Sequence, residues 1–128
     1  MLNPRTSAAS KSDLGARLSP FTVRLSAVGA FRTEEGVVFL APDPSSELRD
    51  AHEHMMDVLG AEGALIDAYY RPAAWIPHCT VAFNVPLPCM DAVIDACQRA
   101  HTPFEASVRR LSAVRYRPAE CVCSIDLV

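Results

Sequence analysis

The residues best suited to chemistry are His78 and Thr80, which stand two positions apart in the stretch WIPHCTVAF. Residues two apart on a β-strand project from the same face, about 7 Å from each other. An imidazole, with an ordinary pKa of about 6.5, exchanges protons at neutral pH, and a threonine hydroxyl donates a hydrogen bond to a phosphoryl oxygen. The spacing therefore suits a phosphate site, although alone it also fits an exposed strand end without a chemical role.

The loop that enters this strand carries three residues suited to an RNA-end ligand, namely Tyr70, Arg71 and Trp75. An aromatic ring stacks on a nucleobase, and an arginine pairs with a phosphate. We predict that these residues bind substrate. The alternative, that the aromatic rings close the rim of the hydrophobic core, fits the sequence equally well.

The remaining histidines and the cysteines do not predict a metal site. His52 shares one helix face with Leu48 and Met55, which is typical of a packed, hydrogen-bonded core residue. His54 points about 200° away around the helix, and we expect it to be solvated. The Cys-x-Cys sequence near the C-terminus lacks the wider spacing of zinc-binding pairs, and no second pair accompanies it. We therefore expect no bound metal.

A hairpin and a helix are predicted before the motif. Apolar and polar residues alternate over 21–27, a turn follows at 33–36, and residues 37–41 form the return strand. Asp43 is positioned to cap a helix that ends at Gly60.

The strand that contains the motif is predicted to have an apolar, inward face and an opposite face. The inward face comprises Cys79, Val81, Phe83 and Val85, and the opposite face comprises His78, Thr80, Ala82 and Asn84. A second amphipathic helix begins near Met90. Two strands follow at about residues 104–116 and 121–128, with a turn at 117–120 between them. This order predicts an α+β fold with a largely antiparallel sheet and helices on one face.

An internal repeat adds to this order. The sequence Arg-Leu-Ser-Ala-Val occurs at residues 24–28 and again at 110–114, and a Pro-Phe pair precedes each copy. Such a repeat indicates two related supersecondary units. Subtracting the offset of 83 to 86 residues gives the equivalent of His78 a position of −5 to −8, upstream of Met1. We therefore expect the first unit to lack its opening strand.

The composition bounds the class of protein. The 128 residues are 50% hydrophobic and carry a formal net charge of −3, which provides no broad basic field for long nucleic acid. Apolar runs are shorter than a membrane span, and five cysteines without framework spacing predict reduced thiols in the cytoplasm. We predict a poorly structured leader, or a remnant of the first repeat, at residues 1–18 and a single domain at 19–128.

Residues from about 21 to 128 resemble the 2′-5′ RNA ligase family of 2H phosphoesterases. The likeness is carried by PFTVRLSAVGAFRTEEGVVFLAP, PSSELRDAHEHM, YYRPAAWIPHCTVAF, RLSAVRYRP and CVCSIDLV, and W-x-P-H-x-T-V-A is its most specific part. The resemblance implies a bilobal fold of two antiparallel-sheet repeats with helices on the outer face. It also implies two His-x-Thr/Ser motifs facing each other across a cleft, with no metal or other cofactor.

The resemblance implies catalytic roles for His78 and Thr80. One histidine of such a site acts as general base on water or a ribose hydroxyl, and the other protonates the leaving oxygen of a 2′,3′-cyclic phosphate or a 2′-5′ linkage; the hydroxyls hold phosphoryl oxygens. This sequence departs from the pattern because no other histidine is followed two positions later by Thr or Ser. With one motif, we expect a weak or inactive catalyst.

Two classes of function stay open. The first is an enzyme of RNA ends or nucleotides whose ligand is a small nucleotide or an RNA-end phosphate. The second is a non-catalytic domain that keeps the phosphate site, or a homodimer that pairs through the sheet edge left by the missing strand.

Overall fold

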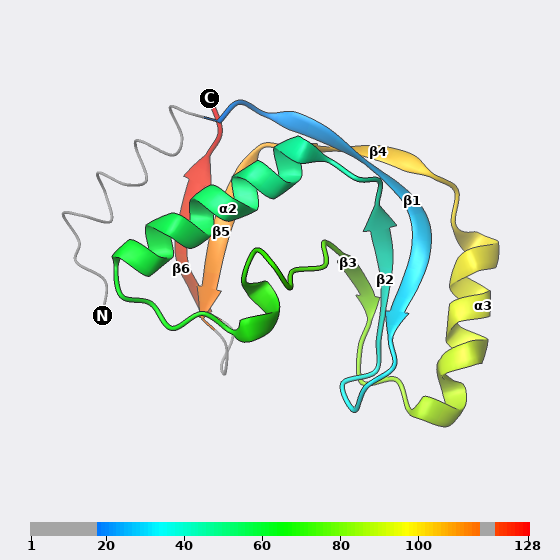
Figure 1. Ribbon diagram of the computed structural model, residues 1–128. Helices are drawn as coiled ribbons and strands as arrows, with labels where there is room; N and C mark the ends of the chain where they lie inside the picture. Colours follow the sequence, from blue (N-terminus) through cyan, green and yellow to red (C-terminus); the bar gives the residue numbers. More distant parts are fainter. Residues whose placement is uncertain (1–17, 116–119) are drawn as a thin grey trace. The chain divides into compact units, whose positions relative to one another are not determined.

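The computed structural model describes residues 18–115 and 120–128 (Figure 1). The chain divides into two compact units. Among the described residues, unit 1 comprises residues 18–22, 46–76, 107–115 and 120–128, and unit 2 comprises residues 23–45 and 77–106. The predicted leader lies outside the described residues except for Leu18, and the predicted turn at 117–120 does so except for Glu120. The α+β class with antiparallel sheets is confirmed.

Unit 2 is built on a four-stranded sheet in the order β3-β2-β1-β4. Its strands are β1 (Phe21–Phe31), β2 (Val37–Pro42), β3 (Cys79–Ala82) and β4 (Phe104–Val108). Both β1 and β3 run antiparallel to β2, so the predicted hairpin is confirmed. The motif strand, β3, lies at one edge of this sheet (Figure 1).

The turn of the hairpin anchors the end of the motif strand. Gly36 has a positive φ of 50°, and its N–H donates to the carbonyl of Thr33. The N–H groups of Asn84 and Val85 donate to the carbonyls of Glu35 and Gly36, at 2.7 and 3.0 Å. A Cβ at position 36 would overlap the backbone of Val85, so only glycine fits this contact.

The predicted second helix is confirmed as α3 (Met90–Ala100). Met90 at its start is fully buried, as is Val38 on β2. Arg32, just after β1, donates to the carboxylate of Asp91 at 2.6 Å. The apolar start of α3 is therefore held in unit 2 by burial, and an exposed ion pair lies beside it.

Unit 1 packs the helix α2 (Ser46–Ala61) against the antiparallel pair β5 (Arg110–Arg115) and β6 (Glu120–Asp126). Met55 of α2 and Ile125 of β6 form its buried centre. The partly buried side chains that pack around them are Leu18, Met56, Leu59, Leu111 and Ala113. No helix in the described part of the chain is long and apolar enough to cross a membrane.

The predicted single strand at 104–116 is instead two strands. Residues of β4 join the sheet of β1, whereas β5 pairs with β6 in a second sheet. The strand breaks at Arg109, whose carbonyl accepts a hydrogen bond from the Leu127 N–H at 2.8 Å. The prediction of one strand overlooked a change of phase, because the alternation of Phe104, Ala106 and Val108 resumes at Leu111, three positions later.

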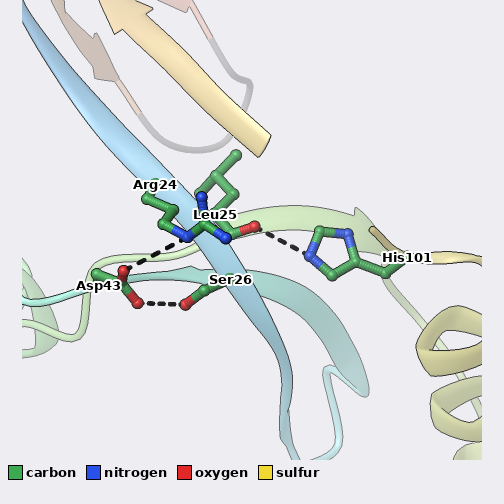
Figure 2. A network of polar contacts seen from close by, with 5 residues as sticks. All are labelled: Arg24, Leu25, Ser26, Asp43 and His101. Atoms are coloured by element: carbon green, nitrogen blue, oxygen red, sulfur yellow. Dashed lines mark hydrogen bonds and ion pairs between the residues drawn. The ribbon is translucent and has the colours of Figure 1, made fainter. Parts of the chain in front are cut away.

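The prediction that Asp43 caps the helix is wrong. The helix α2 begins at Ser46, and the Asp43 carboxylate accepts a hydrogen bond from the Ser26 hydroxyl instead (Figure 2). The same carboxylate lies 3.9 Å from Nε of Arg24. Asp43 thus ties the end of β2 to β1 rather than satisfying helix N–H groups.

The end of α2 also differs from the prediction. The helix runs past Gly60 to Ala61, and the residue with the left-handed backbone is Gly63, at φ 77°. The Gly63 N–H donates to the Gly60 carbonyl and the Ala64 N–H to the Leu59 carbonyl, each at 3.0 Å. These two hydrogen bonds form a Schellman motif. Its left-handed residue is Gly63, three positions after Gly60, where the helix was predicted to end.

Both copies of the repeat form the first strand of an antiparallel hairpin. Arg24 of β1 pairs with Asp43 after β2, and Arg110 of β5 pairs with Asp126 of β6 at 2.7 Å. The sequence repeat therefore corresponds to two hairpins with the same Arg–Asp pairing.

Candidate functional site

The motif residues lie at the start of the edge strand of unit 2. His78 immediately precedes β3, and Thr80 is directly opposite Phe39 of β2. The His78 ring meets the rings of Phe31, edge-on at a centroid distance of 5.0 Å, and Phe39, at 5.4 Å. The imidazole is half-buried against this aromatic wall, while Thr80 is exposed.

The aromatic wall depends on a glycine opposite it. Gly29 pairs with Phe39 across the hairpin, and a Cβ at position 29 would lie 2.7 Å from two carbons of the Phe39 ring. The ring occupies the space that a side chain would take, with its centroid 4.6 Å from that of Phe31. The sequence reasoning did not find these three residues; the signal was an aromatic residue opposite a glycine in the predicted hairpin.

A β-bulge follows the motif. Thr80 pairs with Phe39 and Ala82 pairs with Val38, so Val81 is an extra residue without a partner on β2. A bulge of this kind reverses the alternation of side chains beyond it. The side of the sheet on which His78 and Thr80 lie is therefore independent of the side on which the residues after Val81 lie.

The predicted inward, apolar face of the motif strand is wrong. Cys79 is exposed, and the side chains of Val81 and Phe83 are 49% and 71% exposed. The buried rings of the sheet lie on the His78 side instead. β3 is the edge strand of its sheet and Phe83 lies beyond its end at Ala82, so these side chains are not enclosed by neighbouring strands on both sides.

The predicted substrate-binding residues lie in unit 1. Tyr70 ends a short 3-10 helix (Ala68–Tyr70) that is capped by the Asp67 carboxylate, and both Tyr70 and Arg71 are exposed. The Arg71 carbonyl accepts hydrogen bonds from the N–H groups of Ala74 and Trp75, each at 2.9 Å. This loop is therefore a structured turn.

Trp75 is engaged inside unit 1. Its indole stacks on the imidazole of His52 at a centroid distance of 3.7 Å, with 3° between the ring planes. Burial lowers the pKa of His52, a backbone hydrogen bond with Tyr70 opposes this effect, and the nearby charge of Arg49 adds to it. The sequence predicted a packed His52, and the stacked, half-buried ring agrees with that prediction.

The structure thus brings His78 and Thr80 together in unit 2 and Tyr70, Arg71 and Trp75 together in unit 1. Arg24 and Arg110, which start the two copies of the repeat, are exposed and paired with carboxylates. Within residues 18–115 and 120–128, no group of three or more His, Cys, Asp and Glu residues is arranged to hold a metal ion.

The other histidines have contacts that differ from those of His78. Nε2 of His101, at the end of α3, lies 3.0 Å from the Leu25 carbonyl (Figure 2). His54, predicted to be solvated, is half-buried, and its Nδ1 has no hydrogen-bond partner among the described residues. His78 is the histidine with a hydroxyl two positions along the same strand.

A family model described as the 2'-5' RNA ligase superfamily matches residues 4–120. The chain belongs to this superfamily. The matched range contains His78, Thr80 and both copies of the repeat, so the resemblance inferred from the motif is confirmed at the level of the superfamily. Among curated proteins, none matches the chain.

Proposed function

We propose that this member of the 2′-5′ RNA ligase superfamily contributes one half of a two-histidine phosphodiesterase site. Its substrates are 2′,3′-cyclic phosphates or 2′-5′ linkages of RNA ends or nucleotides. The observation that carries the proposal is the pairing of a half-buried His78, backed by Phe31 and Phe39, with an exposed Thr80 two positions on. A ring held on one side by apolar neighbours keeps its direction while its nitrogens exchange protons.

In the proposed hydrolysis, His78 takes a proton from water as the water oxygen bonds to phosphorus. The bond from phosphorus to the ribose oxygen breaks, and a second acid protonates that oxygen. The Thr80 hydroxyl donates to a phosphoryl oxygen as negative charge develops on it. His78 serves equally well as the acid if the second group is the base.

The chain supplies one such histidine, so its activity alone is proposed to be low. A missing general acid or base costs about 10²- to 10⁴-fold in rate. Tyr70 and Arg71 are exposed, and the Trp75 indole stacks on His52. We assign Tyr70, Arg71 and Trp75 to nucleotide binding. Among the described residues, the free thiols of Cys79, Cys89 and Cys97 favour a reducing compartment such as the cytoplasm.

The test is hydrolysis of nucleoside 2′,3′-cyclic monophosphates, together with binding of a nucleoside 2′-monophosphate followed by NMR of the histidine ring carbons. We expect the nucleotide to shift the His78 signals and expect His78→Ala and Thr80→Val to weaken both binding and turnover. Ser124→Ala, which deletes an exposed strand hydroxyl in unit 1, is the matched control and should leave both unchanged. Equal turnover in His78→Ala and the unmodified chain would refute the role of His78.

A second candidate function is a non-catalytic, self-associating domain. It is favoured by the edge position of β3 and by the exposed, uncharged side chains of Val81 and Phe83 beside it. An uncharged sheet edge invites pairing with another chain. Sedimentation over a wide concentration range tests this candidate: a dimer that Phe83→Lys dissociates supports it, and a monomer at all concentrations excludes it.

A further inference from the structure

His52 of α2 contacts the segment of residues 67–75, the nucleotide loop, at two places. Its imidazole stacks on the indole of Trp75 with the ring planes 3° from parallel. The same imidazole makes a hydrogen bond with the backbone of Tyr70. Tyr70 and Trp75 are the first and last of the three residues assigned to the nucleotide. One side chain of the helix therefore contacts both ends of that set.

The nucleotide loop is also bonded to itself. The Asp67 carbonyl accepts a hydrogen bond from the Tyr70 N–H, and the Arg71 carbonyl accepts one from the Trp75 N–H, each at 2.9 Å. These bonds join residues three or four positions apart, so they give the loop its shape. They do not attach it to another element. The contacts of His52 attach this shaped loop to α2.

Burial separates the attachment point from the residues that face solvent. His52 and Trp75 are half-buried, whereas Tyr70 and Arg71 are exposed. Nε2 of His52 is buried and has no hydrogen-bond partner among the described residues, so ring stacking holds this side of the imidazole. The loop thus has a packed attachment to the helix and an exposed side that a ligand can reach.

We propose that His52 is a positioning residue for nucleotide binding, because it holds the nucleotide loop in the shape that presents Tyr70, Arg71 and Trp75 together. This inference rests on the proposed function for the nucleotide, whereas the hold on the loop comes from contacts within unit 1. His52 acts through the residues that it touches. If the loop is in place in only a fraction of the chains, the apparent affinity falls by that fraction.

The experiment measures binding of adenosine 2′-monophosphate to the whole ¹⁵N-labelled chain through the backbone amide signals of Tyr70, Arg71 and Trp75. We expect His52→Ala to raise the dissociation constant about tenfold, which corresponds to about 1.4 kcal/mol and is the size of a lost aromatic contact with a lost hydrogen bond. His52→Phe keeps an aromatic ring for Trp75. Its dissociation constant should lie between those of the unmodified chain and His52→Ala.

Leu59→Ala is the matched control on the same helix. Leu59 packs against the buried centre of unit 1, so this variant destabilises α2 from its core side. Binding is compared where urea unfolding shows that both variants are folded. We expect Leu59→Ala to bind the nucleotide as the unmodified chain does. Equal losses of affinity in Leu59→Ala and His52→Ala, or an unchanged dissociation constant in His52→Ala, would overturn the proposal.

Hydrogen exchange separates this inference from the proposed function. Without nucleotide, the amides of Tyr70 and Trp75 should exchange about tenfold faster in His52→Ala, because the loop then opens more often. If exchange accelerates and no nucleotide binds to any of these proteins, the hold on the loop is supported and the proposed function fails. If the nucleotide binds while exchange and affinity are unchanged in His52→Ala, the proposed function stands and this inference is overturned.

Discussion

The imidazole of His52 lies parallel to the indole of Trp75, with ring centroids 3.7 Å apart and 3° between the ring planes. This contact joins the middle of α2 to the loop that leads into the motif strand. Nε2 of His52 is buried without a hydrogen-bond partner among the described residues, so packing rather than a polar bond holds this side of the ring. The stack is therefore a structural contact. Tryptophan fluorescence reports on it directly, because the chain has a single tryptophan.

We expect His52→Ala to lower the free energy of unfolding by about 1–3 kcal/mol, because the variant loses the aromatic contact and the backbone hydrogen bond with Tyr70. Trp75 fluorescence should shift to longer wavelength as its covered face meets water. Urea unfolding followed by this fluorescence measures both effects. His54→Ala is the control on the same helix, and it should leave the emission maximum in place.

The lowered pKa of His52 predicts a pH dependence of stability. Its ordinary value is 6.5, and the folded chain favours the neutral ring. The unfolded chain therefore binds the proton more readily, so the contribution of His52 is complete above pH 6.5 and is lost as the pH falls toward the lower folded pKa. Urea unfolding at pH 8 and pH 5.5 should show a larger loss for the unmodified chain than for His52→Phe. Equal losses in the two proteins would contradict the assignment.

The positive-φ glycines give a matched pair of substitutions. Gly63→Ala should cost about 1–2 kcal/mol, because the left-handed backbone is strained and nothing lies within 4 Å of the new Cβ. Gly36→Ala should cost more, since the same strain is joined by overlap with the Val85 backbone. Thermal unfolding measures the difference. A Gly36→Ala variant as stable as Gly63→Ala would show that the hairpin turn and Val85 are not in contact.

The elements that the sequence predicted well are those set by local periodicity. The alternation before Gly36 and the helical spacing after Met90 each depend on neighbours within a few positions, and both elements are present. The pair His78 and Thr80 was visible for the same reason, because its spacing is fixed by the strand itself.

What the sequence left hidden depends on pairing between distant strands. The contact of His78 with Phe31 and Phe39 requires the register of β2 with β3, which the local pattern does not encode. Phe83 is exposed just beyond the end of the edge strand β3, and the sequence pattern does not distinguish a buried apolar face from an exposed one. Asp43 was assigned to the helix because its alternative partner, Ser26, is on another strand.

The aromatic wall behind His78 is expected to be important for stability. Phe39 is 6% exposed, so Phe39→Ala should lower the free energy of unfolding by about 3–5 kcal/mol and leave the imidazole without its support. Phe83→Ala, at a residue 71% exposed, is the matched control and should change stability little. Denaturant unfolding compares the two, and NMR of the His78 ring should show broadened signals only in the first.

The ion pair between Arg110 and Asp126 is expected to contribute little. Both side chains are largely exposed, so Arg110→Ala should change the free energy of unfolding by no more than about 1 kcal/mol, and less at high salt. Unfolding in urea at low and high ionic strength tests this expectation. A cost above about 2 kcal/mol would mean that the arginine stem, rather than its charge, packs against the sheet.

The bulge at Val81 has a consequence for how related sequences differ. Since Val81 already stands outside the one-to-one pairing of β3 with β2, gaining or losing one residue there leaves His78 and Thr80 in register with β2. The chain after the motif is then free to vary in length without turning the motif to the other side of the sheet.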